Sequence, residues 1–331
     1  MSTLKIGVIG AGHLGKIHLK CIKNIPAYTL VGFYDADPKV ATTVAKELDV
    51  KAFGSYEELI KAVDVIDVVS PTSLHFEHAT QAVKNFKHIF IEKPITSNLE
   101  QARDLVSLVS EAGVKAMIGH VERFNPALLA LRADSLKVAP QFIEVHRLAQ
   151  WNPRGTDVSV VLDVMIHDID VVQNLVNSSV KTIRANGVAV VGDTSDIAHA
   201  RIEFHNGCVA NLTASRISFK NMRRLRLYQA DAYVTVDFLE KKTEIFTAHD
   251  TLPAGLPADQ PHYNFKSYTR EKHVTVKSLP VLPVNSIQLE LEELAKAIQQ
   301  DTEPPVTAYD GYSALQTAFM IEEKIATHGA S

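Results

Sequence analysis

The chain is poor in cysteine and has no long apolar run, and these two absences narrow the classes of protein to which it can belong. Cys21 and Cys208 are the only cysteines among 331 residues, and no C-x-x-C spacing occurs. We therefore expect a reducing compartment, and neither a disulfide framework nor a cysteine-bound structural zinc. No apolar stretch is long enough to span a bilayer, and residues 4–9 run into a glycine loop instead of forming a signal peptide. The expectation is a cytoplasmic protein without a membrane partner.

The sequence also lacks an excess of positive charge. Its 34 Lys and Arg residues against 38 Asp and Glu residues give a formal net charge of −4, and no strongly basic stretch occurs. Nucleic acid and anionic membrane surfaces are therefore not expected as partners. Since 46% of the residues are hydrophobic, and a domain typically has about 150 residues, the sequence favours two globular domains with sizeable cores.

The first 124 residues alternate between two periodicities. Short β-branched runs favour buried strands at residues 5–9, 30–34, 65–69, 88–91 and 116–118. Amphipathic stretches between them favour helices at residues 16–24, 39–48, 56–62, 76–84 and 99–112. Continuous apolar strands that alternate with helices predict an α/β domain with a doubly wound parallel sheet covered on both faces.

After residue 124 the pattern changes, and we expect a second domain over residues 125–331. Strands are expected in succession at residues 141–147, 181–190, 197–204, 208–215, 225–229 and 233–238, with Asn206 and Gly207 at a hairpin turn. Helices are expected at residues 127–132, 158–176, 286–300 and 308–328, whereas residues 250–285 show no clear period. Consecutive strands predict an antiparallel sheet, and therefore an α+β domain.

The first expected strand runs into the pattern G-x-G-x-x-G, which reads Gly10-Ala11-Gly12-His13-Leu14-Gly15. Gly10 would allow a tight turn, Gly12 would let the backbone approach a pyrophosphate, and Gly15 would let helix and strand pack closely. The pattern follows a strand and opens a helix, as the dinucleotide-binding loop of a Rossmann domain does. We predict that it holds the phosphates of a nicotinamide cofactor, with a glycine-rich turn that binds nothing as the alternative.

Asp35 ends the second expected strand, about 20 residues beyond the glycine loop, where Rossmann domains carry an acidic residue. Its carboxylate would accept hydrogen bonds from the adenosine ribose hydroxyls and repel a 2′-phosphate, which favours NAD over NADP. Lys39 is a nearby positively charged residue and favours NADP instead. Asp37 is expected to cap the helix that begins at Pro38.

Polar residues crowd the carboxyl ends of three further strands, where ligands bind in open parallel sheets. Lys93 leaves a buried strand and is restricted by Pro94, so its ammonium could hydrogen-bond a substrate hydroxyl. An ordinary lysine that extends to solvent explains the same position equally well. The three polar segments are Ser70-Pro71-Thr72-Ser73-Leu74-His75, Glu92-Lys93-Pro94, and residues 119–126, which include Arg123 and Asn125.

An unusual apolar stretch, residues 158–176, carries Asp163, His167 and Asp170. At positions i, i+4 and i+7 these side chains would share one face of a helix. A carboxylate and an imidazole that point to one spot suit removal of a proton from an alcohol. Three other interpretations stay open on the pattern alone: His167 as a core histidine, the trio as a metal site, and Asp168 with Asp170 as a solvated edge.

Together these motifs resemble the glucose–fructose oxidoreductase, inositol dehydrogenase and MocA family, over essentially the whole chain. The most specific part is Glu92-Lys93-Pro94 at a strand end, followed by Asp163-x-x-x-His167. The resemblance implies a Rossmann domain and an α/β domain built on a large, mostly antiparallel sheet, which would pair copies into a homo-oligomer, a dimer or tetramer. It implies NAD contacts from residues 10–15 and from Asp35, Ser70, Pro71, Thr72, His75, Glu92 and Lys93.

For the reaction, the resemblance implies that Lys93 and His167 flank the reacting hydroxyl, with Asp163 alongside and no metal involved. His167 would be the general base, or would share that role with Lys93. The sequence departs from many members before the aspartate, where Ser159-Val160-Val161 replaces a Gly-Gly pair. The start of that helix and the fit of the substrate are therefore expected to differ.

A narrower resemblance, over residues 119–126 and 162–170, is to the branch of the family that oxidises the 3-hydroxyl of UDP-N-acetylglucosamine. It implies a nucleotide-sugar substrate, with Arg123 and Asn125 in contact with the sugar. The alternatives are a dehydrogenase of another polyol, such as inositol or a free sugar, and an NAD-binding sensor without turnover. A sensor needs no proton acceptor, so the presence of Lys93, Asp163 and His167 favours an enzyme.

Overall fold

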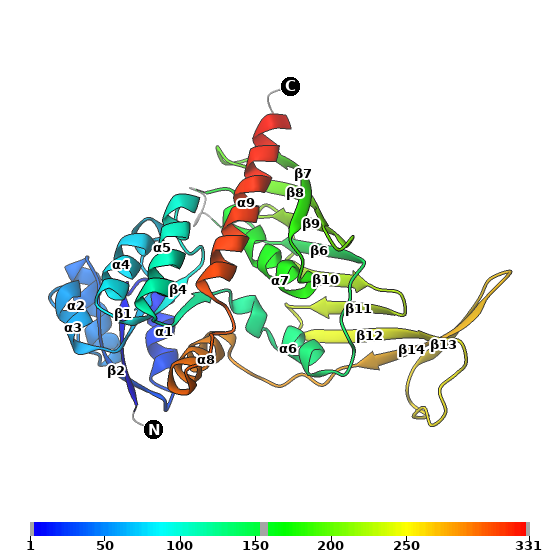
Figure 1. Ribbon diagram of the computed structural model, residues 1–331, viewed down its shortest axis with the longest axis horizontal. Coiled ribbons are helices and arrows are strands. Elements are labelled where there is room, and N and C mark those ends of the chain that lie inside the picture. The colour runs from blue at the N-terminus through cyan, green and yellow to red at the C-terminus, as the bar shows by residue number, and fades with distance from the viewer. Residues whose placement is uncertain (1–2, 153–157, 329–331) are drawn as a thin grey trace. The chain divides into compact units, whose positions relative to one another are not determined.

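The computed structural model describes residues 3–152 and 158–328, which form two compact units (Figure 1). The first unit comprises Met1–Phe124 and Asn285–Gln316, and the second comprises Asn125–Val284 and Thr317–Ser331. The first boundary lies at Phe124, where the sequence pattern changes. The second unit differs from the expected domain of residues 125–331. The segment Asn285–Gln316 belongs instead to the first unit, with the N-terminal segment.

The first unit contains a five-stranded parallel sheet with the strand order β2-β1-β3-β4-β5. The order reverses between β1 and β3, and such a switch point is where open α/β sheets bind ligands. Strands β3 and β5 are buried along their whole length, as expected for a sheet covered on both faces. The strands are β1 (Leu4–Ile9), β2 (Tyr28–Tyr34), β3 (Val65–Val68), β4 (His88–Glu92) and β5 (Ala116–Gly119).

The helices of the first unit follow the amphipathic stretches of the sequence closely. Asp37 caps α2 by accepting the N–H of Lys39, as predicted, and Gly113 ends α5 in the left-handed conformation. Helix α8 packs against α1 and against the strands β4 and β5. The helices are α1 (His13–Ile22), α2 (Pro38–Leu48), α3 (Tyr56–Ala62), α4 (Thr72–Lys84), α5 (Leu99–Ala112), the 3-10 turn η1 (Val121–Phe124) and α8 (Ser286–Gln300).

The described part of the second unit is built on a nine-stranded sheet with the order β13-β14-β12-β11-β10-β6-β9-β8-β7. Every neighbouring pair is antiparallel except β6 and β9, which confirms the mostly antiparallel sheet. Alternate residues of β8 face the core. The strands are β6 (Phe142–Leu148), β7 (Val180–Val188), β8 (Ile197–Phe204), β9 (Val209–Ser215), β10 (Met222–Tyr228), β11 (Ala232–Asp237), β12 (Lys242–His249), β13 (His262–Lys266) and β14 (Glu271–Ser278).

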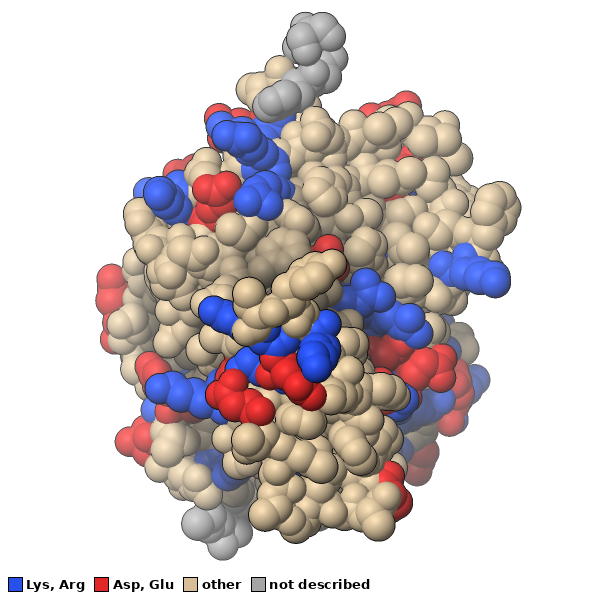
Figure 2. All heavy atoms as spheres, turned by 90° about the vertical axis from the view of Figure 1, so that its right-hand side faces the viewer, with Lys and Arg blue, Asp and Glu red and all other residues tan. Residues whose placement is uncertain are grey.

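Four further elements lie in the described residues: α6 (Pro126–Ala133), the π-helical turn η2 (Val161–Met165), α7 (Ile166–Val176) and α9 (Ala308–His328). Helix α9 begins in the first unit and ends in the second. None of the helices that the structure describes is long and apolar enough to cross a membrane. On the face shown in Figure 2, basic and acidic side chains lie interspersed.

Two expectations about local structure were wrong. Strands β13 and β14 lie in the stretch 250–285, where no periodic element was expected. All five residues of β13 are exposed. Its sequence His262-Tyr263-Asn264-Phe265-Lys266 does alternate polar and aromatic residues, and this strand signal was overlooked. The helix expected as one piece over residues 158–176 instead contains the π-helical turn η2 before α7.

Candidate active site

The glycine loop leaves β1 as a tight turn and leads directly into α1. Gly10 has a φ of +92°, and a Cβ on Gly15 would lie 2.0 Å from the carbonyl oxygen of Gly10. The turn at Gly10 and the close packing at Gly15 are therefore confirmed. A Cβ on Gly12 would meet nothing within 4 Å, and Gly12 itself is exposed. The loop thus leaves open space at the N-terminus of α1, and helix N-termini are common sites of phosphate binding.

Asp35 follows β2 and is half-buried beside the glycine loop. Its carboxylate accepts the N–H of Ala11 at 2.7 Å and the N–H of Asp37 at 2.9 Å. One backbone N–H from the β1–α1 connection and one from the β2–α2 connection therefore hold this carboxylate. His13 is exposed and Leu14 half-exposed in the first turn of α1, on the same connection.

The segments that follow β3 and β4 are joined through His75 in α4. The imidazole lies 2.9 Å from the carbonyl oxygen of Pro94 through Nδ1 and 2.8 Å from that of Ser70 through Nε2. Burial lowers the pKa of His75, and the two carbonyl groups oppose this shift. Ser70, Pro71 and Thr72 therefore lie at the same edge of the sheet as Glu92-Lys93-Pro94, as the sequence pattern predicted. Their contacts with a cofactor stay predictions.

Lys93 directly follows β4 and is half-buried. The Lys93–Pro94 peptide bond is cis. The N–H of Lys93 donates to Oε2 of Glu92 at 3.1 Å. Lys93 thus leaves the sheet at its ligand-binding edge, with its backbone tied to a buried carboxylate.

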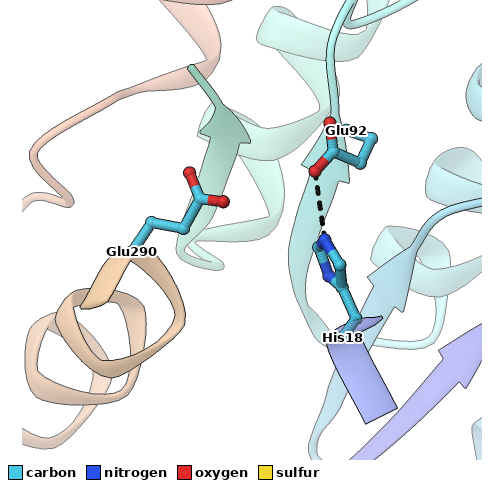
Figure 3. A group of neighbouring side chains, drawn as sticks. All are labelled: His18, Glu92 and Glu290. Carbon is cyan, nitrogen blue, oxygen red and sulfur yellow. Dashed lines mark hydrogen bonds and ion pairs between the residues drawn. The ribbon is translucent and has the colours of Figure 1, made fainter. Parts of the chain in front are cut away.

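Beneath this edge lies a buried cluster that sequence reasoning missed (Figure 3). His18 of α1 lies 2.9 Å from Oδ2 of Asp67 through Nδ1 and 3.1 Å from Oε1 of Glu92 through Nε2. Although burial lowers it, the two carboxylates raise the pKa of His18 well above its usual value. Glu290 of α8 points its carboxyl group at the same place from the opposite side. Burial and the neighbouring Glu92 raise the pKa of Glu290.

Two sequence signals could have indicated this cluster. Asp67 is an acidic residue inside the otherwise apolar run of β3. Glu290 stands on the apolar face of an amphipathic helix, among Leu291 and Leu294. Ionisable residues at such positions are rarely buried unless they are paired or bind a ligand.

In the second unit, Asp163 lies in the turn η2 and His167 in the first turn of α7, both half-buried. A π-helical turn changes the α-helical spacing that was expected to place them on one face, and such turns are frequent at functional sites. Ser159 stands where the family resemblance implies a glycine. Its hydroxyl accepts the N–H of Val161 at 3.2 Å, at the start of this element.

Asp168 and Asp170 do not form a solvated edge, because both are buried. The guanidinium of Arg147 donates to both oxygens of Asp168, from Nε at 3.0 and 2.9 Å and from one terminal nitrogen at 2.8 Å. This buried ion pair anchors α7 to β6. It thereby positions the helix that carries His167.

Arg123 and Asn125, the predicted sugar contacts, are both buried. They lie on either side of Phe124, where the chain passes from the first unit to the second. Arg123 donates to the carbonyl oxygen of Pro305 at 3.1 Å and lies 3.3 Å from a carboxylate oxygen of Asp310. Asn125 caps α6 through the N–H of Ala127 and donates to the carbonyl oxygen of Phe238. The two side chains thus have structural partners, and their contact with a substrate stays a prediction.

Two family models match the chain. One, described as "Oxidoreductase family, NAD-binding Rossmann fold", covers residues 4–120, and the "GFO/IDH/MocA C-terminal domain" covers residues 132–234. UDP-N-acetylglucosamine 3-dehydrogenase from Acidithiobacillus ferrooxidans is 38% identical over 78% of this chain and 81% of its own length. The scyllo-inositol 2-dehydrogenase (NAD(+)) of Bacillus subtilis is 30% identical over 65% of this chain and 68% of its own length.

Solved structures agree with these matches. A structure of UDP-N-acetylglucosamine 3-dehydrogenase from Acidithiobacillus ferrooxidans superposes with a TM-score of 0.88 at 33% identity, and 99% of each chain is covered. Levoglucosan dehydrogenase in complex with NADH has a TM-score of 0.83 at 20% identity over 98% of each chain, a likeness of fold. The similarity therefore extends over both units.

Proposed function

The chain belongs to the GFO/IDH/MocA family of oxidoreductases, and on that premise we propose that it oxidises the 3-hydroxyl of a UDP-N-acetylhexosamine with NAD. The observation that carries the substrate is the similarity to UDP-N-acetylglucosamine 3-dehydrogenase, which extends over 99% of both chains. Two features of the described residues support NAD as the cofactor. They are the open glycine loop and the acidic residue Asp35 beside it.

The cofactor would be held by residues 10–15 and by Asp35, with further contacts from the segments after β3 and β4. The chemistry that bound NAD supplies is acceptance of a hydride. Asp35 supports NAD over NADP, since its carboxylate would repel a 2′-phosphate. The open space at Gly12 is where the backbone would approach the pyrophosphate.

The protein's own chemical task is to orient the sugar and to remove the proton of the reacting hydroxyl. We assign the role of proton acceptor to His167 or Lys93, with Asp163 beside them. The Arg147–Asp168 pair holds the helix of His167, and the Glu92 carboxylate holds the backbone of Lys93. Arg123 and Asn125 would contact the sugar, and no metal takes part in this step.

The test is NADH formation by the purified protein, followed by absorbance, with NAD and UDP-N-acetylglucosamine. myo-Inositol and free hexoses serve as comparators, because the match to an inositol dehydrogenase keeps a polyol substrate in play. Turnover with the UDP-sugar alone supports the proposal. Turnover with a comparator alone keeps the reaction and discards the nucleotide sugar, and tight NAD binding without any turnover favours a sensor.

A further inference from the structure

The cluster beneath the ligand-binding edge joins three elements that are far apart in the sequence. His18 comes from α1, Glu92 from the end of β4 and Glu290 from α8, and all three are buried. Asp67 of β3 holds the far side of the His18 ring through Nδ1. All four residues belong to the first unit.

Glu290 is the member that calls for an explanation. Its side chain is completely buried, and neither carboxyl oxygen has a hydrogen-bond partner among the described residues. Figure 3 shows the carboxyl group of Glu290 directed toward His18 and Glu92. A buried carboxyl group without a hydrogen-bond partner is costly, and the nearby Glu92 carboxylate adds to the cost of ionising it.

The donor atoms are spaced as metal ligands are. One ring nitrogen of His18 and one oxygen each from Glu92 and Glu290 all lie within 4.8 Å of one another. The Nε2 atom of His18 and Oε1 of Glu92 are 3.1 Å apart. Ligands bonded to a first-row ion at about 2.0–2.2 Å lie roughly 3.0–3.5 Å from each other, so a modest inward movement of Glu290 completes the set.

The contact between His18 and Asp67 resembles that between a metal-bound histidine and a carboxylate that orients it without binding the metal. A metal-bound histidine commonly donates its other ring N–H to a carboxylate, which fixes its tautomer and orientation. Asp67 occupies that position on Nδ1 and leaves Nε2 directed at Glu92. The arrangement therefore supplies three ligands and the group that orients one of them.

We propose that His18, Glu92 and Glu290 bind one divalent first-row transition-metal ion, with Asp67 orienting His18. The imidazole favours zinc or a similar ion over magnesium and calcium, which prefer oxygen ligands alone. The ion would link α8 to α1 and β4, and so fasten the returning segment Asn285–Gln316 to the N-terminal segment. Its role is structural and is separate from the proton removal proposed above.

The first experiment measures metal in the full-length protein. The protein is refolded from denaturant with Zn²⁺, dialysed against Mg²⁺ buffer and assayed for bound zinc, and a parallel sample is refolded with Co²⁺ for visible spectroscopy. We expect one tightly held zinc per chain and a Co²⁺ spectrum of nitrogen and oxygen coordination. Failure to retain zinc, or a spectrum of hydrated Co²⁺ only, overturns the proposal and leaves Glu290 as a buried protonated acid.

Variants then assign the site. Glu290→Gln keeps the shape of the side chain and should weaken zinc binding more than about 100-fold, while Asp67→Asn should weaken it about 10–100-fold. Glu293→Gln on the same helix, where Glu293 contacts Lys296, is the matched control and should bind as wild type does. Equal zinc affinity in Glu290→Gln and wild type would place the ion elsewhere and refute the site. Because metal content is the readout, this result is independent of the substrate assay.

Discussion

At the scale of single residues, Lys93 and His167 carry the proposed proton removal. Loss of a general base usually lowers turnover by about 100-fold or more. We expect Lys93→Met and His167→Asn each to reduce kcat to this extent, and His167→Asn to leave the NAD affinity measured by fluorescence titration little changed. Lys84→Met, at the exposed end of α4, is the control. Rates like those of wild type in both variants would refute the assignment.

We propose that Asp35 sets the choice between NAD and NADP. Its carboxylate also accepts the N–H of Ala11, so removing the whole group would damage the loop. Asp35→Asn keeps an acceptor oxygen but removes the charge, and we expect it to raise the ratio of kcat/KM for NADP to that for NAD by about 10-fold or more. Asp35→Ala should lower kcat/KM with both cofactors. An unchanged ratio in Asp35→Asn would show that another residue excludes NADP.

At the scale of elements, Asp196 organises the connection between β7 and β8. Its buried carboxylate accepts the N–H groups of Val190, Val191 and Gly192 and pairs with Arg216 at 2.8 Å. Burial acts to raise the pKa of Asp196, but these hydrogen bonds outweigh burial and hold it well below the usual range. A lowered pKa in the folded state stabilises the protein above the unfolded pKa, and the stabilisation is lost as the pH falls.

We therefore expect Asp196→Ala to lower the free energy of unfolding by about 3–5 kcal/mol at neutral pH, because it removes the carboxylate that balances the charge of the buried Arg216. The difference from wild type should shrink as the pH falls from about 5 toward 2. Denaturant unfolding followed by circular dichroism measures both. Asp193→Asn, an exposed change in the same connection, is the control. A difference that grows on acidification would contradict the assignment.

At the scale of the whole molecule, the second unit carries a row of aromatic side chains on one face of its sheet. Phe142, Tyr228, Tyr233 and Phe246 stand on neighbouring strands with ring centroids 5.7, 4.8 and 5.1 Å apart. All four are half-buried. Ion pairs flank the row, among them Arg224 with Asp237. Such a mixture of aromatic and paired charged groups suits an interface between copies of one chain.

We predict that this face pairs copies into a homodimer or tetramer, in line with the family likeness. Tyr233→Lys places a charge between Tyr228 and Phe246, and we expect it to shift the protein to monomers in light scattering coupled to size-exclusion chromatography. Phe86→Ser, a change at a side chain of the first unit that is 75% exposed, should leave the assembly unchanged. A monomeric wild-type protein would refute the prediction, as would a Tyr233→Lys variant that stays assembled.

The sequence by itself determined the features that depend on neighbouring residues. Apolar runs and helical periods predicted the parallel sheet of the first unit, the G-x-G-x-x-G turn at Gly10 and Gly15, and the cap at Asp37. Each of these depends on backbone geometry or on contacts within a few residues, which composition and spacing record directly. The family resemblance rested on the same short motifs and was confirmed by the matched family models.

Only the tertiary structure decided which distant residues meet. It brings Glu290 to His18 and Glu92, returns Asn285–Gln316 to the first unit, and places the exposed strand β13 at the sheet edge. It also buries Asp168 against Arg147, although the sequence allowed a solvated edge. These contacts join segments separated by tens to hundreds of residues. Their partners leave no periodic trace in a single sequence, because burial and pairing depend on how whole elements pack.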